Sequence, residues 1–91
     1  MSEKPDQKEP AQWEAQSHID HDDHPLRWWA CVEVVGYVAL FQGQMWDTLE
    51  AAIDDLPSLK ELANSYAAMH NAEIVKWTGY WDKKEGMVTK P

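Results

Sequence analysis

The stretch that decides the fold runs from residue 26 to residue 56 and reads LRWWACVEVVGYVALFQGQMWDTLEAAIDDL. When successive residues are placed 100° apart, as they are in an α-helix, most apolar side chains from Trp28 to Leu56 fall on one face. The acids lie on the opposite face. Pro57 ends this pattern, and Ser58 with Glu61 forms a capping box that opens a second apolar stripe. We therefore predict a mainly α protein, a two-helix antiparallel hairpin of residues 24–56 and 58–71.

The sequence allows two interpretations of the secondary structure in each of two segments. The valine-rich run 28–41 has high β propensity, so the alternative is an α+β domain with a strand or hairpin there. Residues 72–81 read either as a strand that returns at 87–89, which would make a C-terminal β-hairpin, or as a continuation of the second helix to Trp77.

The first quarter of the chain reads as a separate, unfolded region. Residues 1–23 carry seven acids, two prolines and a single branched aliphatic side chain, Ile19. A segment of this composition buries too little apolar surface to offset its loss of entropy. We expect a flexible acidic tail over 1–23 and a single small domain over 24–91. Trp13 is the exception, either as a docking anchor or tucked back onto the domain.

The composition excludes several functions. The chain of 91 residues has a net charge of −8, which disfavours direct binding to nucleic acid or to an anionic membrane. Its one cysteine, Cys31, favours a reducing compartment, and we expect a cytoplasmic protein in which Cys31 is a small buried hydrophobe. No catalytic motif is present, so we predict no enzyme and no cofactor.

An acidic stripe on the first predicted helix, which continues with Glu61 on the second, suggests how the protein acts. We predict a small acidic binding or accessory protein that works by protein–protein interaction, with contacts through Asp47, Glu50, Asp54, Glu61 and Trp13. The alternative is an inhibitor that mimics nucleic acid and occupies the basic groove of a DNA- or RNA-binding protein, as small phage inhibitors do. A small ligand held between subunits also stays open.

The run HIDHDDH at residues 18–24 offers a further alternative. Imidazole and carboxylate are good ligands for zinc, nickel or copper. The candidate ligands of such a metal-binding module are His18, Asp20, His21 and His24.

A second apolar strip lies on the back of the first predicted helix. A helix that is apolar on two sides needs two partners, and one hairpin covers only one side. We therefore predict a homo-oligomer. Its contact residues would be Trp29, Val32, Gly36, Ala39, Leu40 and Gly43.

Overall fold

Polar and less polar side chains alternate strictly from Trp13 to Asp20. In the computed structural model, which describes residues 9–35, 39–80 and 88–89, this run belongs to strand β1 (Ala11–Asp23). Ala15, Ser17 and Ile19 are buried, and the residues between them are half-buried or exposed. Alternation with a period of two is the signature of a strand that has one face on a core.

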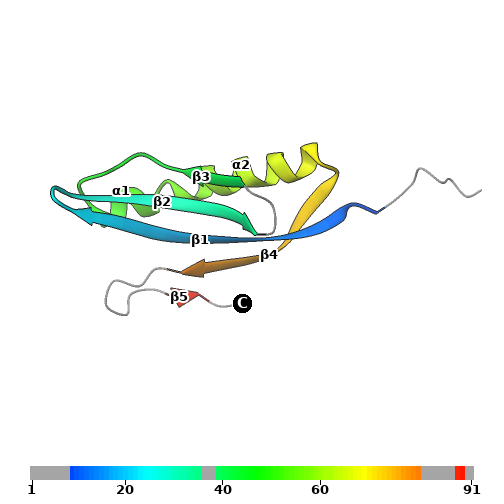
Figure 1. The fold of residues 1–91 in the computed structure, drawn as a ribbon, viewed down its shortest axis with the longest axis horizontal. Helices are drawn as coiled ribbons and strands as arrows, with labels where there is room; N and C mark the ends of the chain where they lie inside the picture. Colours follow the sequence, from blue (N-terminus) through cyan, green and yellow to red (C-terminus); the bar gives the residue numbers. More distant parts are fainter. Residues whose placement is uncertain (1–8, 36–38, 81–87, 90–91) are drawn as a thin grey trace, which may run out of the picture.

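β1 lies in the middle of a mixed sheet with the order β3-β2-β1-β4-β5 (Figure 1). Its partners are β2 (Leu26–Val35), which is antiparallel, and β4 (Ala72–Tyr80), which is parallel. β3 (Ala39–Gln42) extends the sheet beyond β2, and β5 (Val88–Thr89) extends it beyond β4. A cis peptide bond joins His24 to Pro25 in the turn between β1 and β2.

The register of β1 fixes which side chains share a face. Its pairs with β2 run from Glu14–Val35 to Asp23–Leu26, and its pairs with β4 run from Ala11–Ala72 to His18–Tyr80. One register shift, between Trp13 and Glu14, interrupts the pairing with β4. Residues 14–18 are therefore paired along both edges.

Two helices separate β3 from β4. In α1 (Leu49–Ile53), the Thr48 side chain caps the first turn by accepting a hydrogen bond from the Ala51 amide at 3.3 Å. α2 (Leu56–Met69) has Pro57 in its first turn, where the missing N–H costs nothing. Asn71 follows α2 with a φ of 53°, the left-handed conformation that ends many helices. Its carbonyl accepts a hydrogen bond from the Ala11 amide at 3.0 Å, which joins the helix end to β1.

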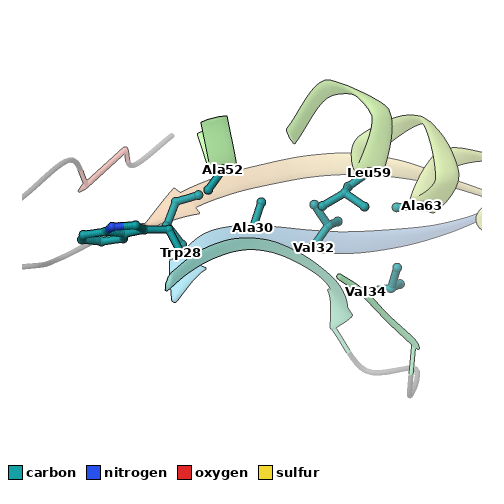
Figure 2. Packing of buried hydrophobic residues seen from close by; sticks show 8 residues of the cluster. Trp28, Ala30, Val32, Val34, Ala52, Leu59 and Ala63 are labelled. Atoms are coloured by element: carbon teal, nitrogen blue, oxygen red, sulfur yellow. The ribbon is translucent and has the colours of Figure 1, made fainter. Parts of the chain in front are cut away.

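The core lies between these helices and one face of the sheet. β2 contributes Trp28, Ala30, Val32 and Val34, and Figure 2 shows Leu59 of α2 beside Val32. The buried residues of α2 are Leu59, Ala63 and Ala67, spaced four apart along one helix face. Alanine at two of these three positions lets the helix backbone lie close to the sheet.

The structure overturns the predicted fold class. The protein is mainly β, and the two short helices among the described residues, α1 and α2, do not form an antiparallel hairpin. Residues 28–35 belong to β2 and residues 39–41 to β3, which is the local structure that the alternative expected there. The valines fit a pleated surface better than a helix. Because β2 carries apolar residues on both faces, its alternation was hidden and a helical phase could be fitted instead.

The prediction of a flexible tail is wrong for residues 11–23, because they form the central strand of the sheet. Residues 1–8 lie outside the described residues. The segment after α2 is strand β4 and not a helical extension to Trp77. Neither described helix combines the length and the apolar content that crossing a membrane requires.

Because α2 packs closely against the sheet and Ala63 is fully buried, we expect a larger side chain at this position to destabilise the fold. Ala63→Leu should lower the free energy of unfolding by about 1–3 kcal/mol, because the added volume has no space to enter. Asn64→Leu, at the exposed next position, should change it by less than about 0.5 kcal/mol. Urea denaturation followed by tryptophan fluorescence measures both, and equal effects of the two substitutions would contradict this packing.

Candidate functional site

The sheet has a second face, turned away from α1 and α2, which we call the open face. β1 and β2 contribute most of it, because their side chains alternate between the core and this face. His18 of β1 lies directly opposite Cys31 of β2, and Asp20 of β1 lies directly opposite Trp29 of β2. The open face comprises Glu14, Gln16, His18, Asp20, Trp29, Cys31, Glu33, Val35, Leu40, Gln42, Lys76 and Thr78.

Cys31 lies in the middle of the open face and is nevertheless only 2% exposed. Larger residues surround the small thiol, with His18 opposite it on β1 and Gln42 opposite it on β3. Burial raises the pKa of the Cys31 thiol, and the negative charge of Asp20 raises it further. The nearby donor groups of Gln42 and Trp29 oppose this rise. Cys31 is therefore buried, as predicted, and its thiol is protonated at neutral pH.

Three potential metal ligands meet at this point. One donor atom each from His18, Asp20 and Cys31 lies within 4.8 Å of the other two. The Nε2 atom of His18 is 3.7 Å from Oδ2 of Asp20. The metal ligands predicted from the sequence included His18 and Asp20 but not Cys31, which lies on the next strand. The alternation in β1 was the signal that could have placed His18 and Asp20 on one face.

The other two predicted metal ligands lie elsewhere. His21 is on the core side of β1, where its ring is 5.0 Å from that of Trp28 and its Nε2 is 3.6 Å from an Asp23 oxygen. His24 is exposed in the turn before Pro25. The predicted set of four therefore splits, because neighbouring residues of a strand point to opposite faces.

The predicted anchor Trp13 is half-buried on the core side of β1. Its ring centroid lies 6.0 Å from that of Tyr66 and 5.7 Å from that of His70, both on or next to the end of α2. Of the two alternatives for Trp13, the structure favours the side chain that tucks back onto the domain.

The four acids of the predicted stripe are all exposed in the helical segment. Asp47 precedes α1 and forms an ion pair of 2.9 Å with Arg27 of β2. Glu50 lies in the first turn of α1, and Asp54 is its C-cap residue. Glu61 lies in α2.

Of the six residues predicted for self-association, the five that the structure describes do not form a strip. Val32 is completely buried in the core, whereas Trp29 and Leu40 lie on the open face. Ala39 faces the core side, and Gly36 lies outside the described residues. The helical argument for a homo-oligomer therefore no longer applies, and self-association itself stays an untested prediction.

Gly43 has a structural role in this fold. A Cβ atom there would lie 3.1 Å from the Cβ of Asp55, and closer still to its carboxylate. That carboxylate accepts hydrogen bonds from the Trp46 indole at 2.8 Å and from the backbone N–H of Gln44 at 3.2 Å. These bonds hold the segment after β3 against the start of α2. Replacement of Gly43 would therefore disturb the fold itself, whatever the oligomeric state.

We compared the chain with protein-family models, with curated proteins and with solved structures, and none of the three comparisons gave a match. The functional argument therefore depends on the geometry and charge of this chain.

Because Cys31 is buried, we expect its thiol to react slowly with alkylating reagents. In the folded, chelator-treated protein, iodoacetamide should modify Cys31 at least about 10-fold more slowly than in urea, because the sulfur is covered and little thiolate is present. Mass spectrometry of timed samples measures both rates. Equal rates would mean that Cys31 is accessible and that β2 and β1 are not paired as described.

Proposed function

We propose that this protein is a small binding protein that acts by protein–protein contact and whose partner presents a basic surface. The observation that carries the proposal is the charge of the folded part. The described residues include twelve acids and three bases, a net charge of −9 before histidine is counted. The acids are Glu9, Glu14, Asp20, Asp22, Asp23, Glu33, Asp47, Glu50, Asp54, Asp55, Glu61 and Glu73, and the bases are Arg27, Lys60 and Lys76.

Among the described residues, little of this negative charge is neutralised by basic side chains. Ten of the twelve acids are exposed, and the half-buried ones are Glu33 and Asp55. Arg27 pairs with Asp47, and the ammonium of Lys60 lies 5.4 Å from the ring centroid of Trp77. A surface of one sign raises the association rate with an oppositely charged partner and repels anionic ones. Such a surface supports a basic protein as the partner.

The open face is the surface that we assign to this contact. The helices cover the opposite face of the sheet, and among the described residues no element covers this one. It combines the acids Glu14, Asp20 and Glu33 with apolar side chains, of which Val35 is 43% exposed and Leu40 58% exposed. Apolar groups surrounded by charged ones are typical of surfaces that bind other proteins.

A narrower form of the proposal is the nucleic-acid mimic, in which the basic surface is the groove of a DNA- or RNA-binding protein. The observation that favours it is the distribution of acids over both layers, from Glu14 on the sheet to Glu61 on α2. A protein inserted into such a groove meets positive charge on more than one side. For either form we propose the cytoplasm as the compartment, since the single cysteine is free.

Site-specific photocrosslinking in the source cells tests the proposal. A photoreactive phenylalanine at Val35 samples the open face, and the same residue at Leu62, which is 52% exposed on α2, samples the helical layer. We expect a basic protein to crosslink from position 35 alone if it binds the open face, and from both positions if this protein is inserted into a groove as a nucleic-acid mimic. The purified pair should then bind with an affinity that falls steeply as salt rises, because salt screens exposed charges.

Competition by DNA or RNA for the same purified partner separates the two forms of the proposal. Displacement supports the mimic, and its absence supports a basic surface outside the nucleic-acid groove. A reconstituted partner that is acidic, or whose affinity does not change with salt, would contradict both.

A further inference from the structure

We propose that His18, Asp20 and Cys31 form a zinc-binding site on the open face, with a fourth coordination position open to solvent. The three residues come from two neighbouring strands and do not form a contiguous sequence motif. They meet because β1 and β2 pair in a register that sets His18 directly opposite Cys31. Asp20 is on the same face of β1 as His18, two residues further along. This inference does not depend on the proposed function.

The distances suit a small ion. Bond lengths of about 2.0–2.3 Å in tetrahedral zinc sites place ligand atoms roughly 3.3–3.8 Å apart. The Nε2 atom of His18 and the Oδ2 atom of Asp20 are 3.7 Å apart, and all three donor atoms are within 4.8 Å of one another. The Asp20 side chain is 55% exposed, so it has room to rotate toward the ion.

The ligand types select the metal. Thiolate is a poor ligand for magnesium or calcium, and thiolate combined with imidazole and carboxylate is typical of zinc. Glu33, half-buried on the same face, and the exposed Asp22 of β1 add negative charge near the site. Three protein ligands leave one tetrahedral position, and the exposed side of the face turns it toward water.

A second, independent observation concerns the indole of Trp29. Its Nε1 atom is buried and makes no hydrogen bond of the usual geometry among the described residues, although its N–H lies near the Cys31 thiol and lowers the pKa of that group. A buried donor without an acceptor is costly, and structures rarely keep one. Trp29 is two residues from Cys31 on the same strand face and opposite Asp20. When zinc binds, the Cys31 sulfur is a thiolate, which accepts hydrogen bonds far better than a thiol.

Zinc titration of the full-length protein, reduced and stripped of metal, tests the site. We expect one Zn²⁺ per chain, measured by competition with a chromophoric chelator. His18→Ala should weaken binding by more than about 100-fold, since loss of an outer partner alone costs roughly 10–100-fold. Trp29→Phe, which removes the indole N–H and leaves a smaller aromatic ring, should weaken it by about 10-fold. Circular dichroism of each variant verifies that it folds.

His24→Ala is the matched control, because it removes a histidine from the same tract but not from the open face. It should leave zinc affinity unchanged. Substitution of Co²⁺ for Zn²⁺ should give the intense sulfur-to-cobalt charge-transfer absorption of a thiolate ligand, and Cys31→Ser should abolish it. Three results would each overturn the proposal: no binding by the wild type, equal losses in His18→Ala and His24→Ala, or a cobalt spectrum without the sulfur band.

Discussion

Hydrogen bonding of β1 along both of its edges is the constraint on which the rest of the structure depends. β1 joins the β2–β3 hairpin on one side to β4 and β5 on the other. Those two parts of the sheet are far apart in the sequence, and both helices lie between them. Without β1 the sheet would divide into two small pieces, each too narrow to be stable alone. A central strand can be this polar because the side chains on its open side face water, while its core side carries small residues such as Ala15 and Ser17.

The same pairing decides where chemistry can occur. Because side chains in a strand alternate, the register of β1 sends His21 toward the core and His18 toward the open face. It then places His18 against Cys31, a residue thirteen positions away, and Asp20 against Trp29. The open face therefore combines a buried thiol, an imidazole and carboxylates within a strongly acidic surface. A shift of one residue in the register would exchange the two faces and separate this cluster.

Some of this could be predicted from the sequence and some could not. Leu59, Ala63 and Tyr66 recur at helical spacing, so the helix near 58–71 was readable, and the burial of Cys31 followed from its type. β1 was misread because its acids, together with the two prolines that precede it, suggested a tail, although Trp13 to Asp20 alternate strictly. β2 was misread because Trp29 and Cys31 add apolar character to its open side. The parallel pairing of β1 with β4 joins residues about sixty positions apart, and no local pattern encodes such a contact.

Native-state hydrogen exchange of the backbone amides of residues 11–23 tests the central role of β1 most directly. If β1 is the middle strand, the amides of residues 14–18, which are paired on both sides, should be among the slowest to exchange, and opening them should require global unfolding. Residues 20–23 have a partner on one side and should exchange sooner. Exchange of the whole segment at the rate of an unfolded peptide would contradict the account, since the sheet, the open face and the cluster around Cys31 all require this strand.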